Sequence, residues 1–222
     1  MRKDLPFLAI LLCALFQVTN LNAQNSSFSF SGGISNSAIP IYSMKEESIL
    51  LSSHSVSNLS FRGSYNRRLR KNIVLSAELA YHRIGGNSIN RIPSQPGFFV
   101  HNVSLNYLSV ASAPYMEFKF GRNTISLGLG PSISYLLNDR IENFQFEENV
   151  IVGSELESSD LKPLDFGVNG IVQFSRSIAN NFDLILAVRK YQGLVDISRV
   201  DLGQKVYNEY AEITLGLNIP IN

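Results

Sequence analysis

The sequence predicts an all-β fold, namely an eight-stranded antiparallel up-and-down β-barrel that crosses a membrane. Two observations lead to this prediction. Apolar and polar residues alternate with a period of two over eight segments, as they do in strands that have two different faces. The connections between these segments are alternately long and tight, which places all tight turns at one end of an up-and-down barrel.

The first residues have the pattern of a secretory signal peptide. Arg2 and Lys3 precede the apolar run Leu5–Phe16, and a polar stretch then ends at the small residue Ala23. The apolar run is too short to cross a bilayer as a helix, for which ~20 residues are needed. We therefore expect residues 1–23 to be a signal peptide that is cleaved near Ala23.

The remaining residues, 24–222, are expected to form one outer-membrane β-barrel domain. They contain no cysteine, because the single cysteine is Cys13, so disulfides, cysteine metal sites and cysteine nucleophiles are excluded. Cys13 follows two leucines rather than the small residue of a lipoprotein signal, and we do not interpret it as a lipid anchor. The net charge of +1 gives no reason to expect a nucleic-acid partner.

The alternation is clearest between Thr124 and Leu137 and is repeated in every other predicted strand. In chain order the strands are Ser26–Ser35, Ser55–Arg68, Ile73–Arg83, Asn102–Phe120, Thr124–Leu137, Leu164–Ser175, Phe182–Tyr191 and Ala211–Ile219. Their apolar faces carry, in the same order, Phe28, Phe30 and Ile34; Leu59, Phe61 and Tyr65; Ile73, Leu75, Leu79 and Tyr81; Leu108, Val110, Met116 and Phe118; Ile125, Leu127, Leu129, Ile133 and Tyr135; Phe166, Val168, Val172 and Phe174; Phe182, Leu184, Leu186 and Val188; and Ile213, Leu215, Leu217 and Ile219.

The connections indicate the kind of barrel. Three of them are tight, at residues 69–72, 121–123 and 177–181. The others are long and cover residues 36–54, 84–101, 138–163 and 192–206. Short periplasmic turns and longer external loops are typical of outer-membrane barrels, and an even number of strands leaves both termini in the periplasm.

Charged residues on the polar face decide which face points outward. A soluble lipocalin-like barrel would turn the apolar face inward, and charges would then lie on its surface rather than in its cavity. A narrow membrane barrel instead encloses its polar face, where opposite charges can pair. We expect the inward charges Arg62, Glu78, Glu117, Lys119, Asp183, Arg189 and Glu212 to fill the lumen, because eight strands enclose a space only just wide enough for side chains.

Aromatic residues near both ends of the apolar face fit two membrane interfaces: Tyr65, Phe118, Phe120, Phe174 and Phe182 near the tight turns, and Tyr81, Tyr135, Phe166 and Tyr207 near the long loops.

The segment Leu105–Leu137 contains the glycine-rich motif Leu127-Gly-Leu-Gly-Pro131 and, after it, Tyr135-Leu136. With such motifs the mature chain resembles, over essentially its whole length and most specifically in this segment, the PorT-like outer-membrane β-barrel family of Bacteroidota. The family's Gly-rich strand of the form LGxGPxxxYL is matched by Leu127-Gly-Leu-Gly-Pro131 followed by Tyr135-Leu136. A Tyr-Leu-Glu-Ile-Pro-type strand is only partly matched, because Ser109-Val-Ala111 follows Tyr107-Leu108. Leu164-Asp-Phe-Gly167 and Tyr191-Gln-Gly-Leu194 resemble later family signatures. The resemblance implies the barrel fold, an outer-membrane location and a link to protein secretion.

The three histidines are the strongest candidates for chemistry. His82 is expected on the polar face beside Glu78, as a buried paired histidine. His54 and His101 lie where long loops meet strands, so a lipid-modifying site at the rim would use one of them, with Ser52, Ser53 or Ser55 beside His54. No nucleophile elbow or HExxH motif is present, and we predict no catalytic, cofactor-binding or metal-binding residue.

Two charged segments lie outside the strands. Residues 138–163 contain Asp139, Glu142, Glu147, Glu148, Glu155, Glu157 and Asp160, which we interpret as a solvated acidic loop, with a divalent-cation site as the alternative. Arg67, Arg68, Arg70 and Lys71 cluster at the first tight turn. This basic cluster is suited to the anionic head groups of the inner leaflet, or else to a periplasmic partner.

The sequence therefore predicts a non-catalytic outer-membrane barrel with a filled interior and a structural or loop-mediated binding role. The alternatives are an accessory component of a secretion system and, behind it, a lipid-modifying enzyme at the rim. The expected partners are outer-membrane lipids and lipopolysaccharide, with an envelope or secretion protein as a further candidate. No cofactor is expected.

Overall fold

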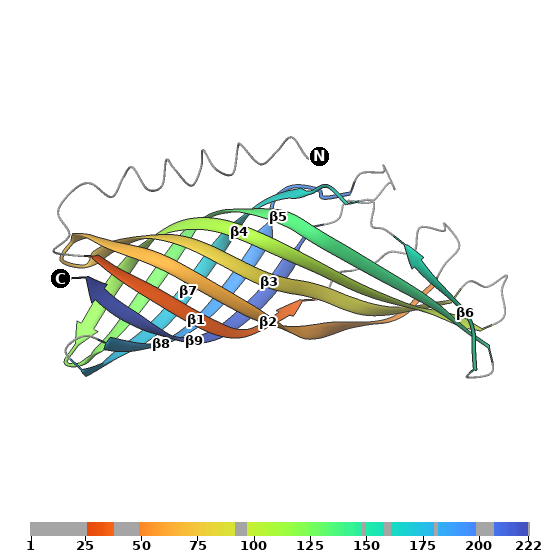
Figure 1. Cartoon of the computed structure of the whole chain (residues 1–222), viewed down its shortest axis with the longest axis horizontal. Coiled ribbons are helices and arrows are strands. Elements are labelled where there is room, and N and C mark those ends of the chain that lie inside the picture. Colours follow the sequence, from red (N-terminus) through yellow and green to blue (C-terminus); the bar gives the residue numbers. More distant parts are fainter. Residues whose placement is uncertain are drawn as a thin grey trace.

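The computed structural model of the chain is an antiparallel β-barrel (Figure 1). It describes residues 26–37, 49–91, 97–147, 150–157, 161–179, 182–198 and 207–221, so the expected signal peptide lies outside the described residues. The strands are β1 Ser26–Ser37, β2 Ile49–Arg70, β3 Ile73–Arg91, β4 Phe98–Phe120, β5 Asn123–Glu147, β6 Val150–Glu157, β7 Leu164–Ala179, β8 Phe182–Gly193 and β9 Glu209–Ile221.

Eight of these strands form a closed ring. Their order around the ring is β1-β2-β3-β4-β5-β7-β8-β9, and every pairing is antiparallel. The ring closes where β1 pairs with β9, from Ser26 opposite Ile221 to Ser37 opposite Tyr210. The expected fold class, an eight-stranded up-and-down barrel, is confirmed. In the described part of the chain, β6 is an additional strand that pairs with β5 beyond the ring.

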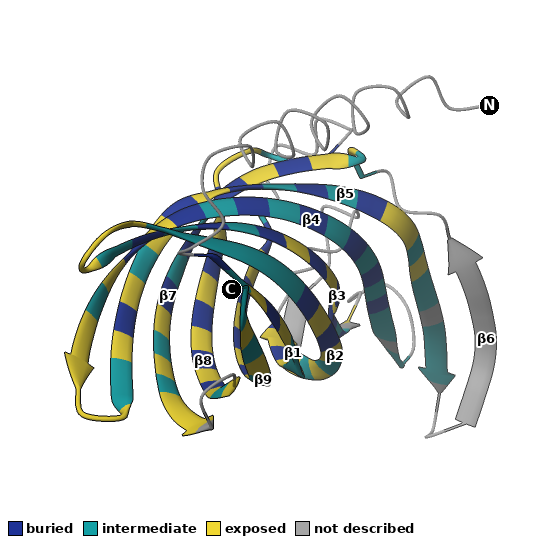
Figure 2. Ribbon diagram, turned by 60° about the vertical axis from the view of Figure 1, so that its left-hand side comes forward, coloured by how far each residue is buried: buried dark blue, intermediate teal, exposed yellow. Residues whose placement is uncertain are grey.

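The burial pattern confirms that the apolar face points outward. Exposed and buried residues alternate along the strands (Figure 2), and in β9 the exposed Ile213 and Leu215 flank the buried Thr214. Each strand of the ring contributes exposed apolar side chains, far more than a water-facing surface tolerates. The aromatic side chains expected at the two interfaces include the exposed residues Phe118, Phe120, Phe174, Phe182, Tyr81 and Phe166.

The tight turns lie at one end of the barrel, which we call the turn end, and β1 begins and β9 ends there (Figure 1). Lys71 and Asn72 join β2 to β3, and Gly121 and Arg122 join β4 to β5. Gly121 has a φ of 63°, a conformation that glycine adopts without a steric penalty. No helix within the described residues is long and apolar enough to cross a membrane.

The opposite end differs from the sequence prediction. Residues 84–101 and 138–163 were expected to be loops, but most of their described residues belong to strands β3, β4, β5 and β6. Strands β2 to β5 contain 22, 19, 23 and 25 residues, whereas ~9–11 suffice for a strand that crosses a bilayer. These four strands therefore extend far beyond the others, at what we call the hairpin end (Figure 1).

The extension was missed because the hydrophobic alternation changes phase there. We call the ring of exposed apolar side chains around the barrel the apolar belt, and there the apolar residues point outward. At the hairpin end Ile84, Val103, Leu105 and Leu136 instead point inward and are buried in one cluster. The outward positions become polar, as at Asn102, Ser104 and Asn106. This is the arrangement of a barrel in water, so a search for outward apolar residues finds no strand.

A substitution at Gly130 tests the close packing of the ring. A Cβ atom at Gly130 would lie 2.0 Å from the Ser112 backbone oxygen, whereas one at Gly170, on the neighbouring strand, would meet nothing within 4 Å. We expect Gly130→Ala to lower the free energy of unfolding by roughly 1–3 kcal/mol. Gly170→Ala should leave it unchanged or raise it by about 0.4–1 kcal/mol. Urea unfolding in detergent micelles, followed by heat-modifiable gel mobility, measures both, and equal stability of the two variants would contradict the packing described.

Candidate functional site

The lumen of the barrel contains a buried ion cluster at mid-height. Arg62 of β2 reaches Glu78 of β3 and Glu212 of β9, with Nη–Oε distances of 2.7 Å in both pairs. Arg189 of β8 lies 3.8 Å from Glu78 and donates a hydrogen bond of 3.1 Å to Thr214. The cluster thus joins strands from different parts of the ring.

The charges of this ion cluster balance, since two arginines face two glutamates. Tyr115 of β4 adds a 2.6 Å hydrogen bond to Glu78 Oε1. A buried carboxylate without a partner is costly, so each member of the cluster depends on the others. The prediction that Arg62, Glu78, Arg189 and Glu212 point inward and pair is confirmed.

The apolar cluster at the hairpin end closes the lumen above the ion cluster. It contains Tyr107, Tyr191 and Tyr210 beside the aliphatic residues already named. Asn208 donates hydrogen bonds to Tyr107 Oη (3.0 Å) and to Asp165 Oδ2 (2.8 Å), and Tyr191 donates one of 2.8 Å to Asp165. We call this apolar cluster, together with Asn208 and Asp165, the cap. Aromatic rings and hydrogen bonds from several strands therefore cover the lumen there.

His82 is buried, as predicted, but its partners differ from those expected. Its ring lies 4.7 Å from the ring of Tyr210 and 5.9 Å from that of Tyr107, so it packs against the cap instead of pairing with Glu78. Ser109 Oγ lies 3.4 Å from His82 Nε2. A serine beside a histidine can be a catalytic pair, but here both are buried in the lumen below the cap.

The other two histidines do not form one rim site. His54 is opposite Asn87, and His101 is opposite Ser88. Residues that face each other across a ladder share a face, and successive residues of β3 point to opposite faces. His54 and His101 therefore lie on opposite faces of the sheet, and the side chains of Ser52 and Ser53 lie outside the described residues.

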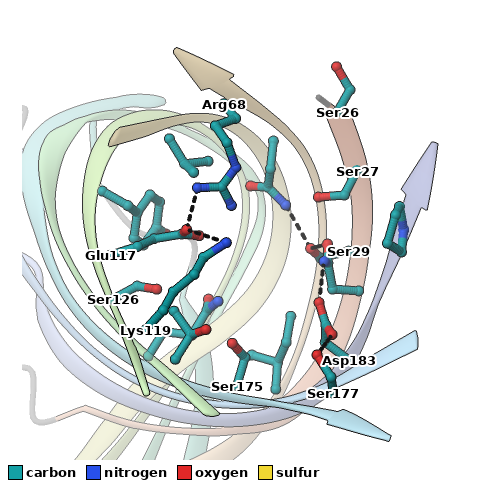
Figure 3. A pocket seen from close by; sticks show the side chains of 18 of the residues that line it. Ser26, Ser27, Ser29, Arg68, Glu117, Lys119, Ser126, Ser175, Ser177 and Asp183 are labelled. Atoms are coloured by element: carbon teal, nitrogen blue, oxygen red, sulfur yellow. Dashed lines mark hydrogen bonds and ion pairs between the residues drawn. The ribbon is translucent and has the colours of Figure 1, made fainter. Parts of the chain in front are cut away.

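At the turn end the lumen opens into a polar cavity of about 400 Å³, which we call the vestibule (Figure 3). On one wall Arg68 Nη1 lies 2.7 Å from Glu117 Oε2, and Lys119 Nζ lies 3.9 Å from the same atom. On the other wall Asn218 donates a 3.0 Å hydrogen bond to Asp183. The predicted inward positions of Glu117, Lys119 and Asp183 are thus confirmed, but these residues line a cavity rather than fill the barrel.

The basic cluster and the acidic segment predicted from the sequence have different environments in the structure. In the basic cluster at the first turn, Arg68 lines the vestibule, whereas Arg70 and Lys71 are exposed. The acidic segment is mainly strand rather than a solvated loop, and Arg140 lies 2.5 Å from Glu142 there. Among the described residues, no three histidine, cysteine or acidic side chains are grouped as metal ligands would be.

A solved structure of similar architecture matches this chain. The neisserial surface protein A structure matches with a TM-score of 0.55 and 11% identity, over 88% of this chain and 96% of that one. Ail, the attachment invasion locus protein of Yersinia pestis, matches with a TM-score of 0.44 and 13% identity, over 88% and 99% of the two chains. OprG of Pseudomonas aeruginosa matches with a TM-score of 0.44 and 12% identity, over 89% and 97%. At 11% identity, the match to neisserial surface protein A shows a shared fold alone. No curated protein sequence matches significantly.

The model of one protein family matches most of the chain. It is described as "Outer membrane protein beta-barrel domain" and covers residues 22–199, which include seven of the eight strands of the ring. The match agrees with the closed ring and the outward apolar belt. The chain belongs to the outer membrane protein beta-barrel domain family.

Proposed function

We propose that this protein is a non-catalytic, closed barrel of the outer membrane that acts through its extended strands or its turn end. The observation that supports this proposal best is the double obstruction of the lumen. The ion cluster of Arg62, Glu78, Arg189 and Glu212 occupies its middle, and the cap covers it at the hairpin end. A solute that entered the vestibule would meet both.

Orientation follows from the rule that outer-membrane barrels place short turns in the periplasm. The vestibule then opens to the periplasm, and strands β2 to β5 extend outside the cell. Beyond the apolar belt these strands have the residue pattern of a sheet in water. They offer a platform for binding, and the barrel anchors it.

The second candidate is an accessory role in protein secretion. It rests on the resemblance of Leu127–Pro131 and Tyr135-Leu136 to the PorT-like family, and on the location of the vestibule at the turn end. A periplasmic component could bind there, where Arg70 and Lys71 are exposed. A lipid-modifying role for His54 or His101 has less support, because neither a nucleophile elbow nor an HExxH motif accompanies these histidines.

A double-mutant cycle tests the ion cluster. Arg62→Ala leaves the buried Glu212 without its 2.7 Å partner, and we expect it to lower the free energy of unfolding by about 3–5 kcal/mol. Adding Glu212→Gln removes the unpaired charge and should recover part of that loss. Urea unfolding of the wild type, both single variants and the double variant gives the coupling energy. Additive effects would mean that the two side chains do not interact as described.

Electrical recordings test whether the lumen is closed. We expect the mature protein, reconstituted in planar bilayers, to show no stable open-channel steps at neutral pH. The Arg62→Ala/Glu78→Ala variant, which lacks two side chains of the ion cluster, serves as a comparison. It should show brief openings if the cap is also loosened. Steady conductance of the wild-type protein would rule out a filled barrel.

Gene deletion separates the proposed roles. If the barrel is a binding platform, deletion should change neither the set of secreted proteins nor the lipid profile of the envelope. Loss of secreted cargo would support the accessory secretion role. An altered lipid profile that wild-type protein restores and His54→Ala or His101→Ala does not would support an enzyme. Membrane fractionation of the tagged protein provides the common control, since recovery from the soluble periplasm would contradict all three.

A further inference from the structure

The outer wall of the barrel becomes polar abruptly where the apolar belt ends on β3, β4 and β5. Tyr81 of β3 lies opposite Leu108 of β4, and both point outward. Two residues further along, Arg83 of β3 lies opposite Asn106 of β4, and Asn106 lies opposite Asn138 of β5. This row of outward polar residues thus lies at the level expected for lipid head groups.

Hydrogen bonds order this row. Tyr81 donates a hydrogen bond of 3.1 Å to Asn106 Oδ1, and Asn106 donates one to Asn138 Oδ1. Above them, Arg83 Nε donates a hydrogen bond of 2.5 Å to Ser104 Oγ. Side chains of three neighbouring strands are therefore held in place on the lipid-facing side of the wall.

Two arginines lie beside Ser104, one on each neighbouring strand. Ser104 lies directly opposite Arg140 of β5, so Arg83 and Arg140 flank Ser104 from the two neighbouring strands. Both arginines are exposed and line a hollow of about 280 Å³ in the outer wall. Glu142 also lines it, and its Oε1 lies 2.5 Å from Arg140 Nη2. Two positive charges and one negative charge leave the hollow positive.

The chemistry of the hollow suits a phosphate group. Guanidinium groups bind phosphate through paired N–H donors, and the Ser104 hydroxyl provides a further polar contact. The wall below carries the exposed apolar side chains of Leu79 and Tyr81, which suit an acyl chain. An amphiphile with a phosphate above and acyl chains below would match the two surfaces in the same vertical order.

We propose that Arg83 and Arg140 form a binding site for the phosphate group of a phosphorylated glycolipid in the outer leaflet. This inference rests on the proposed location of the barrel, with its hairpin end outside the cell. Two cations elsewhere on the barrel serve for comparison: Lys190 pairs with Glu209, and Lys162 donates a 2.9 Å hydrogen bond to the Asp196 backbone oxygen. They lie on the β7–β9 side of the barrel and do not line the hollow.

Binding of a fluorescent lipid to the purified mature protein in detergent micelles tests the proposal. The probes are diphosphorylated lipid A and the same lipid without its phosphates, with inorganic phosphate as a competitor. We expect Arg83→Gln/Arg140→Gln to weaken binding of the phosphorylated lipid by roughly tenfold or more. The charge-matched control Lys162→Gln/Lys190→Gln should bind as the wild type does.

The remaining arms identify the source of the phosphate and guard against misfolding. The wild type should prefer the phosphorylated lipid, and inorganic phosphate at millimolar concentration should not displace it. Displacement by inorganic phosphate would show a site for free phosphate instead. Glu142→Gln should tighten binding severalfold, because it frees Arg140 from a competing carboxylate. Heat-modifiable mobility reports the fold of every variant.

The site would be disproved if the Arg83→Gln/Arg140→Gln variant bound the lipid as well as the Lys162→Gln/Lys190→Gln control does. It would also be disproved if removing the phosphates from the lipid had no effect on binding. Membrane fractionation of the same variants is independent of these measurements. A protein that fractionates with the outer membrane but fails the lipid test would disprove the phosphate site alone. A protein found in the soluble periplasm would disprove the proposed location, whatever its affinity for the lipid in micelles.

Discussion

A strand that crosses lipid needs a partner on each side for its N–H and C=O groups, because the bilayer core contains no water to replace them. In this chain the first and last strands supply each other's missing partner, because β1 pairs with β9 along the whole length of β1. Closure with eight strands fixes the size of the lumen, which side chains must then fill. The inward positions are polar, so the filling is made of charges that neutralise each other. The ion cluster around Arg62 is thus a consequence of closing a small ring with a polar interior.

The filling changes along the barrel axis. Balanced charges occupy the centre, aromatic and aliphatic side chains form the cap at the hairpin end, and the turn end remains hollow. A symmetric plug would leave the two sides of the membrane with similar surfaces. Here a polar cavity faces one side and a long twisted sheet faces the other. With its centre filled, the barrel offers surfaces for contact only at its two ends and on its outer wall, within the part of the chain that the structure describes.

Sequence reasoning succeeded where the membrane imposes a simple rule and failed where it does not. Within the belt, lipid outside and a narrow lumen inside make every second residue apolar, and this was enough to identify the strands, the outward face and the pairing of Arg62 with acidic partners. At the hairpin end the outer surface meets water, and Ile84, Val103 and Leu105 turn inward instead. The period of two continues but its phase is reversed, so these segments were predicted to be loops. The contact of His82 with Tyr210 brings together β3 and β9, which are far apart in the chain, and no local pattern reveals it. The position of Arg140 beside Ser104 was missed because residues 138–163 were predicted to be a loop.

The reversal of phase also bears on function. Where apolar residues change from the outer face to the inner face, the wall passes from hydrocarbon to water, and lipid head groups lie at that boundary. The change occurs on β3 between Tyr81, which is exposed, and Ile84, which is buried in the cap. Two residues lie between them: His82 points inward, and Arg83 points outward. A cation at this position costs little to expose and gains most from an anionic head group. The same boundary that ends the membrane-spanning part of the barrel therefore also determines where a lipid phosphate would be bound.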